Sequence, residues 1–165
     1  MHKRMDTKKI LFVCLGNICR SPAAQAVMQK MVDEKGLSAQ VEIDSAGLGN
    51  WHVGQLPDAR MRKHGARRGY AVNHLARQFH GATDFARFHY IVVMDAENYR
   101  GVMAQVRDEA DGKKVLRMGD FLRDNAHYTV VPDPYYGGPE DFELALDLIE
   151  EGCRHLLESI IYNKV

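Results

Sequence analysis

The segment Cys14-Leu-Gly-Asn-Ile-Cys-Arg20 carries a nucleophilic thiol and a guanidinium at the two ends of one short turn. An apolar run, Lys9–Val13, precedes it, and Ser21 and Pro22 follow as a helix N-cap and a first-turn proline. A helix N-terminus and a nearby cation both stabilise a thiolate. Backbone amides of the turn could bind phosphate oxygens as a concave nest, and Arg20 could bind two of those oxygens at once. This spacing predicts phosphoryl transfer to Cys14.

A cysteine that takes up a phosphoryl group needs an acid to protonate the departing oxygen. Asp133 is the candidate, because the segment Val131-Pro-Asp-Pro-Tyr-Tyr-Gly-Gly138 holds it between two prolines that restrict its backbone. The same group could then activate water against the cysteinyl phosphate. The hydroxyl of Ser21 could donate to the Cys14 sulfur and stabilise it as a leaving group. Asn17 could hold an unusual backbone turn, and Tyr135 and Tyr136 could wall an aromatic slot.

The composition indicates one globular domain over residues 1–165, with residues 1–8 as a loose N-terminal leader. Hydrophobic residues make up 45% of the chain and charged residues 27%, and the formal net charge is zero. We therefore expect neither a nucleic acid nor a membrane as a partner. Three cysteines are too scattered for a disulfide scaffold, and the eight histidines have no ligand spacing. We expect a cytoplasmic protein, a monomer or weak dimer, without metal or cofactor.

Short apolar runs alternate with amphipathic segments along the chain. The expected strands are the apolar runs Lys9–Val13 and His89–Met94, the short segment Lys114–Leu116, and Gln40–Ser45, in which polar and apolar residues alternate. The expected helices run from Ser21 to Gly36, over Asp58–Gly65, from Asp95 to about Arg107, and over Phe142–Ile160, while residues 46–57 and 124–139 are expected to be irregular. This alternation predicts a single-domain three-layer α/β/α fold with a central four-stranded parallel sheet, Rossmann-like or flavodoxin-like. The phosphate-binding loop would follow the first strand, at the sheet edge where such folds bind ligands.

Six segments resemble the low-molecular-weight protein-tyrosine phosphatase family. They are Val13-Cys-Leu-Gly-Asn-Ile-Cys-Arg-Ser-Pro22, Asp44-Ser-Ala-Gly47, Trp51-His-Val-Gly54, His74-Leu-Ala-Arg-Gln78, Val93-Met-Asp95 and Asp133-Pro-Tyr-Tyr136. The resemblance implies a phosphotyrosine-bearing protein as substrate and inorganic phosphate as product. It also implies Cys14 as nucleophile, Arg20 as phosphate binder and Asp133 as general acid, which agrees with the chemical argument.

The resemblance implies further roles for residues around the loop. Asn17, Ser21, Ser45 and His74 would form a hydrogen-bonded set that shapes it, and Trp51 and Tyr135 would border the mouth for an aromatic substrate. The implied phosphate- and substrate-binding residues are Leu15, Gly16, Asn17, Ile18, Cys19, Ser21, Trp51 and Tyr135. In the family the cysteine at the position of Cys19 can form a reversible disulfide with the nucleophile, which protects the thiolate from over-oxidation.

Other activities fit the same residues and stay open as alternatives. Related protein-arginine phosphatases carry threonine at the position of Ile18, so isoleucine and the Tyr135-Tyr136 pair favour phosphotyrosine. A thiol-dependent arsenate reductase would need further cysteines, and none occurs between Cys19 and Cys153. Cys153 itself falls on the apolar face of the last helix and is expected in the core. A module that binds phosphate without catalysis would not need the full set of thiol, guanidinium and carboxylate.

Overall fold

A computed structural model describes residues 6–124 and 127–165 of the chain. The strands are β1 Lys8–Cys14, β2 Val41–Gly47, β3 Tyr90–Val93 and β4 Val115–Arg117. The helices are α1 Arg20–Glu34, α2 Ala59–Arg67, α3 Gly81–Arg87, α4 Ala96–Met103, α5 Glu109–Lys113, the short 3-10 helix η1 Met118–Phe121, and α6 Pro139–Ile161.

The four strands form one parallel sheet in the order β2-β1-β3-β4. The first strand therefore lies in the interior of the sheet, and Ile10 aligns with Ile43 on one side and with Tyr90 on the other. Cys14 ends β1 opposite Gly47, the last residue of β2. The predicted three-layer α/β/α fold with a four-stranded parallel sheet is confirmed, and the loop that carries Cys14 leaves the carboxyl edge of the sheet.

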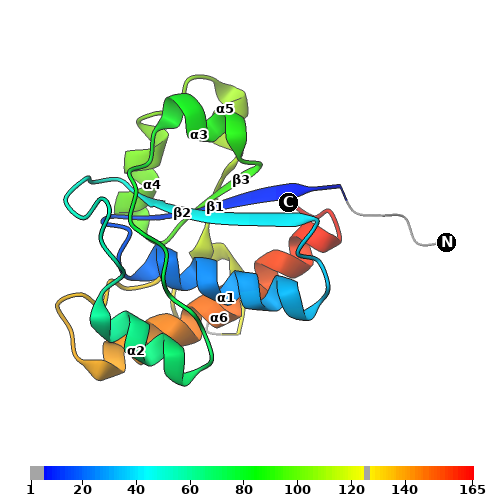
Figure 1. The fold of residues 1–165 in the computed structure, drawn as a ribbon. Coiled ribbons are helices and arrows are strands. Elements are labelled where there is room, and N and C mark those ends of the chain that lie inside the picture. Colours follow the sequence, from blue (N-terminus) through cyan, green and yellow to red (C-terminus); the bar gives the residue numbers. More distant parts are fainter. Residues whose placement is uncertain (1–5, 125–126) are drawn as a thin grey trace.

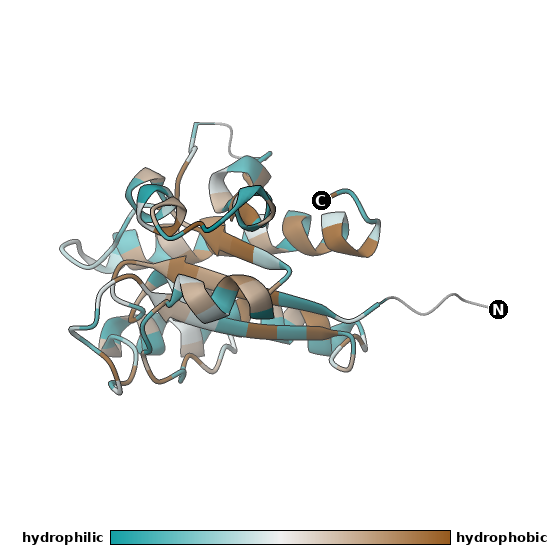
Figure 2. Ribbon diagram, turned by 90° about the horizontal axis from the view of Figure 1, so that it is seen from above, coloured by the Kyte–Doolittle hydropathy of each residue, from teal (hydrophilic) through white to brown (hydrophobic). Residues whose placement is uncertain are grey.

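Helices cover both faces of the sheet, with α1, α2 and α6 on one side and α3, α4 and α5 on the other (Figure 1). The pleat of β1 divides its side chains between two cores. Ile10 and Phe12 pack into the core under α1 and α6, and Leu11 and Val13 pack into the core under α3 and α4. A strand that is buried on both faces needs a continuous apolar sequence, which is why β1 has no polar alternation. The hydrophobic colour of Figure 2 accordingly runs along the central strands.

The last helix was expected to bury one apolar stripe, and it does. Phe142, Ala145, Leu146, Ile149, Cys153, Leu156, Leu157 and Ile160 are all buried on α6. The first helix ends as expected, with Gly36 in the left-handed region at φ +69° just beyond it. These two helices contact each other beneath the sheet, where the Cys153 Sγ lies 3.8 Å from the carbonyl oxygen of Ala24.

Some boundaries differ from the sequence expectation. The first strand begins at Lys8, inside the expected N-terminal leader of residues 1–8. Residues 1–5 of that leader lie outside the described residues. The helix expected from Asp95 to about Arg107 ends at Met103, and α5 follows as a separate helix. Its start is fixed by the Asp108 carboxylate, which accepts from the Asp111 backbone N–H at 2.8 Å. Helix α3 was not expected from the sequence at all.

Candidate active site

The turn that follows β1 is held in shape from the side of β2. Asn17 adopts a left-handed backbone conformation with φ +58°, which asparagine tolerates better than most residues. A side chain on Gly47 would come within 2.9 Å of the Asn17 backbone nitrogen, so the last residue of β2 has to be glycine for the turn to pack there. Helix α1 begins at Arg20, so Cys14 lies between the carboxyl end of a strand and a helix N-terminus.

Polar side chains under the turn form a chain of hydrogen bonds that ends on the Cys14 sulfur. The Asn17 side-chain amide donates to Ser21 Oγ at 2.8 Å and to Ser45 Oγ at 3.0 Å. Ser21 Oγ lies 2.9 Å from Cys14 Sγ. Because Ser21 accepts from Asn17, its own hydrogen is available to the sulfur. Ser45 Oγ in turn donates to Gln25 Oε1 at 2.6 Å.

His74 lies at the edge of this set. Its Nδ1 is 3.6 Å from Asp44 Oδ1, and the Asn17 side-chain oxygen instead accepts from the Arg77 backbone N–H at 3.0 Å. Burial lowers the pKa of His74, against the attraction of Asp44. Of the four residues that the resemblance implied, Asn17, Ser21 and Ser45 are joined through their side chains, and His74 contacts the Asp44 carboxylate and the Ser45 backbone.

Arg20 is almost fully buried and is held by hydrogen bonds to Asp95 and to the Val131 carbonyl. Its Nη1 donates to Asp95 Oδ2 at 2.6 Å and to the Val131 carbonyl at 2.9 Å. Its Nη2 lies 3.7 Å from Asp133 Oδ2. Burial alone would lower the pKa of Arg20, but attraction to Cys14, Asp95 and Asp133 outweighs it and the pKa lies above its ordinary value. The guanidinium is therefore a permanent positive charge.

The segment that carries Asp133 is anchored to the end of β3. The Val131 backbone N–H donates to the Met94 carbonyl at 2.9 Å. Asp133 Oδ1 accepts from the Tyr135 backbone N–H at 3.1 Å, and its carboxylate is partly exposed. The rings of Tyr135 and Tyr136 meet edge to face with centroids 4.9 Å apart. The acid candidate and an aromatic wall therefore come from one short loop.

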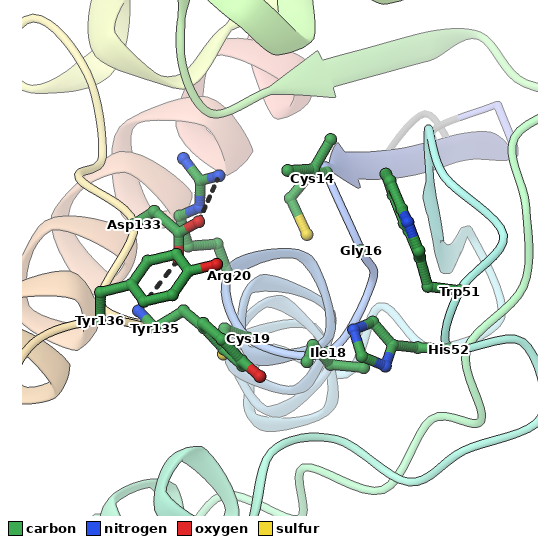
Figure 3. Close-up of a pocket in the computed structure, with 11 residues that line it drawn as sticks. Cys14, Gly16, Ile18, Cys19, Arg20, Trp51, His52, Asp133, Tyr135 and Tyr136 are labelled. Atoms are coloured by element: carbon green, nitrogen blue, oxygen red, sulfur yellow. Dashed lines mark hydrogen bonds and ion pairs between the residues drawn. The ribbon is translucent and has the colours of Figure 1, made fainter.

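These groups surround one open cavity of about 360 Å³ (Figure 3). Its lining residues are Cys14, Leu15, Gly16, Ile18, Cys19, Arg20, Trp51, His52, Asp133, Tyr135 and Tyr136. Trp51 stands across the pocket from the two tyrosines, and its side chain folds over Gly49, where a Cβ would overlap the ring. Because Trp51 is 64% exposed, its ring is available for contact with a ligand. Asn17, Ser21, Ser45 and His74 are not among the lining residues.

Cys19 has an environment unlike that of Cys14. Burial, and then the nearby charges of Asp58, Cys14 and Asp133, raise the pKa of the Cys19 thiol far above its ordinary value. Burial likewise raises the pKa of Cys153. All three cysteines are free thiols in this structure. Cys19 lines the same pocket as Cys14 but stays protonated at neutral pH.

A protein-family model described as low molecular weight phosphotyrosine protein phosphatase matches residues 9–165. The chain belongs to this family. A low molecular weight protein-tyrosine-phosphatase of Streptomyces coelicolor is 40% identical over 93% of this chain and 94% of its own length.

Solved structures of phosphatases are similar to this chain over nearly its whole length. An Entamoeba histolytica protein tyrosine phosphatase with Hepes in its active site has a TM-score of 0.92 and 42% identity, and it covers 96% of this chain and 100% of its own. A second structure, described as DARP, a Drosophila arginine phosphatase, has a TM-score of 0.83 and 35% identity, with 91% and 96% covered. Members that differ in their named substrate therefore share this fold.

Two residues of this low molecular weight phosphatase were not among the predicted site residues. His52 lines the pocket, and Asp95 holds Arg20. His52 is the immediate neighbour of the predicted Trp51, so the motif spacing alone could have found it. The sequence analysis placed Asp95 at the start of a helix and in a segment that resembles the family, and its carboxylate does cap that helix by accepting from the Asn98 backbone N–H at 2.8 Å. Its second role depends on a contact that is distant in sequence.

One group of ligand-type side chains lies apart from the lining of the pocket. Ligand atoms of Asp124, Glu151 and His155 lie within 4.8 Å of one another. The Arg154 guanidinium donates to Asp124 Oδ2 at 2.8 Å, and the Asp124 backbone N–H donates to Glu151 Oε2 at 2.8 Å. Arg154 thus already compensates the charge of the Asp124 carboxylate.

Proposed function

We propose that this chain hydrolyses phosphotyrosine in proteins through a covalent cysteinyl phosphate. The observation that carries the proposal is the meeting of Cys14, Arg20 and Asp133 in one pocket, with Arg20 Nη2 only 3.7 Å from Asp133 Oδ2. A thiol beside a fixed cation, with a carboxyl group across the same space, matches the needs of phosphoryl transfer. Family membership supports the same chemistry.

In the first step the phosphate of the substrate binds to the backbone amides of the turn and to Arg20. The Cys14 thiolate attacks phosphorus, and the bond from phosphorus to the phenolic oxygen breaks. Asp133, in its protonated form, transfers its proton to that oxygen, so tyrosine leaves as a neutral phenol. Charge on the equatorial oxygens of the transition state is stabilised by Arg20.

In the second step water replaces tyrosine. The Asp133 carboxylate takes a proton from the water as its oxygen attacks the phosphorus of the cysteinyl phosphate. The bond from sulfur to phosphorus breaks, and the sulfur leaves as a thiolate. Ser21 Oγ, at 2.9 Å, can donate to it as that charge develops. Inorganic phosphate then departs, and the enzyme returns to its starting state with Asp133 protonated.

The walls of the pocket support an aromatic substrate. Trp51 on one side and Tyr135 on the other leave a slot in which a phenyl ring can stack. Ile18 adds an apolar contact near the phosphate site. Phosphoarginine is longer, flexible and charged along its side chain, so this lining favours phosphotyrosine over it. One of the similar solved structures is described as an arginine phosphatase, so phosphotyrosine and phosphoarginine have to be compared directly as substrates.

We further propose a cytoplasmic location and a phosphotyrosine-bearing protein as the partner, with the chain acting as a monomer or weak dimer. A reactive thiol with two more free cysteines suits a reducing compartment. None of the helices in the described ranges is long and apolar enough to cross a membrane.

A single set of peptides tests the proposal. One sequence would carry phosphotyrosine, phosphoarginine or phosphoserine at its centre, and phosphate release would be measured for each with the wild-type chain and with Cys14→Ser. We expect hydrolysis of phosphotyrosine by the wild type and loss of at least about a thousandfold in Cys14→Ser. A preference for phosphoarginine would show that the chain is a protein-arginine phosphatase. Hydrolysis by Cys14→Ser at the wild-type rate would refute the mechanism.

A further inference from the structure

Arg60 lies in the first turn of α2 and is not one of the residues that line the pocket. Asp58 binds its guanidinium in a fork, with Nε 3.1 Å from Oδ1 and Nη2 2.9 Å from Oδ2. The two residues are close in sequence and partly exposed, so their ion pair contributes little to the stability of the fold. What this fork does is fix the direction in which the guanidinium points.

The fixed guanidinium reaches the loop of the acid candidate. Arg60 Nη2 donates to the Tyr135 carbonyl oxygen at 2.9 Å, across 75 positions of sequence. The central carbon of the guanidinium also lies over two rings, 5.5 Å from the centre of Tyr135 and 4.6 Å from that of the buried Phe142. Arg60 therefore joins α2, α6 and the acid loop at one point.

Tyr135 passes this constraint on to Asp133. The Tyr135 backbone N–H donates to Asp133 Oδ1 at 3.1 Å, while the carbonyl of the same residue is held by Arg60. The start of α2 is tied to the phosphate-binding turn as well, because the Asp58 N–H donates to the Ile18 carbonyl at 2.8 Å. The arginine thus links the turn that would bind phosphate to the loop that would deliver the proton.

We propose that Arg60 is a positioning residue that holds Tyr135, and through it Asp133, at the correct distance from the phosphate-binding turn. The proposal rests on the proposed function, in which Asp133 protonates the leaving oxygen. Arg60 itself touches neither the phosphate nor the leaving group. Its loss therefore acts on proton delivery, and a substrate that needs little protonation will show little of the effect.

The test compares two aryl phosphates in kcat/KM, which reports transfer of the phosphoryl group to cysteine. We expect Arg60→Ala to reduce kcat/KM about tenfold for phenyl phosphate, whose leaving group is poor, and less than about twofold for para-nitrophenyl phosphate. Arg67→Ala is the matched control, because it removes an exposed arginine from the same helix, and it should change neither value. Equal losses for both substrates would overturn the inference.

A double-mutant cycle separates positioning from general structural damage. Asp133→Asn keeps an oxygen acceptor for the Tyr135 N–H but cannot supply the proton. If Arg60 acts through Asp133, adding Arg60→Ala to Asp133→Asn leaves kcat/KM for phenyl phosphate nearly unchanged. Additive losses would overturn the inference. If Asp133→Asn alone shows no dependence on the leaving group, the assignment of the acid fails, and the proposed function with it.

Arg60→Ala could lower the stability of the fold, so a conservative variant at the same position serves as a second test. Arg60→Lys retains one donor for the Tyr135 carbonyl but cannot form the fork with Asp58. We expect it to recover part of the loss for phenyl phosphate while melting within a few degrees of the wild type. Failure of the lysine to recover any of that loss, in a protein that melts normally, would count against a role for the Tyr135 contact.

Discussion

Ser21 Oγ lies 2.9 Å from Cys14 Sγ, and the hydroxyl already accepts a hydrogen bond from Asn17 at 2.8 Å. Since a hydroxyl has one hydrogen to give, the geometry directs that hydrogen to the sulfur, the nearer of its two acceptors; the Ala46 carbonyl is 3.5 Å away. This contact is needed most when the sulfur leaves phosphorus as an anion. We therefore expect Ser21 to act mainly in the second step of the reaction.

Ser21→Ala should therefore slow breakdown of the cysteinyl phosphate more than its formation. A hydrogen bond to a charged group contributes about 1.5–3 kcal/mol, which corresponds to about ten- to hundredfold in kcat. With para-nitrophenyl phosphate we expect a burst of nitrophenol close to the enzyme concentration, followed by slow turnover. Ser38→Ala, at an exposed turn, is the control and should behave as wild type. A lower kcat without a burst would show that Ser21 does not act mainly on the breakdown of the cysteinyl phosphate.

Asn17 should be important for stability as well as for catalysis. Asn17→Ala removes the donor to Ser21 and Ser45 and the acceptor of the Arg77 N–H, and it leaves alanine at φ +58°. We expect a loss of about 2–4 kcal/mol in the free energy of unfolding, measured by urea denaturation.

Two further variants separate the terms of that loss. Asn163 has φ +54° at the exposed end of α6, so Asn163→Ala reports the backbone cost alone, about 1 kcal/mol. Asn17→Gly lacks the same hydrogen bonds as Asn17→Ala but has no backbone strain at this φ, so it reports the cost of the lost hydrogen bonds. If Asn17→Ala cost no more than Asn163→Ala, the buried network would contribute nothing measurable to folding.

The two pocket thiols should differ sharply in alkylation. Cys14 and Cys19 both line the cavity, with exposed fractions of 3% and 4%, so access does not distinguish them. Burial raises the pKa of Cys19, and only a thiolate reacts with the reagent. Cys19 should therefore react only at a pH above the one at which an ordinary thiol ionises.

With iodoacetamide at pH 7, we expect peptide mapping to find the label on Cys14, and inorganic phosphate to protect it. Cys153 serves as the internal control, because it is buried in the core and its pKa is also raised. Faster labelling of Cys19 than of Cys14 at neutral pH would contradict this assignment.

The phosphate-binding turn could be predicted from sequence because its parts are contiguous. Cys14, Arg20 and Ser21 lie in one short segment, and an apolar strand and a helix start leave few arrangements for it. The central strands β1 and β3 could be predicted because burial on both faces demands an unbroken apolar run. Asp133 followed from the chemistry, because the reaction needs an acid and this aspartate is restrained by prolines.

The rest depends on contacts between distant segments. Helix α3 buries Phe85 edge to face against Phe79, with ring centres 5.6 Å apart, and its seven residues are too short for a helical period to be recognised. The contact of Arg60 with the Tyr135 carbonyl could not be predicted, since nothing near Arg60 in sequence indicates it. Asp95 could be recognised as a cap but not as the partner of Arg20.

The covalent intermediate tests the central claim most directly. Ser21→Ala would be mixed with para-nitrophenyl phosphate, quenched in acid during steady turnover, digested and analysed by mass spectrometry. We predict one phosphoryl group on the peptide that contains Cys14, carried by sulfur, and none when Cys14→Ser is added to the same protein. A phosphoryl group on any other residue, or full turnover with no phosphorylated cysteine, would contradict the account.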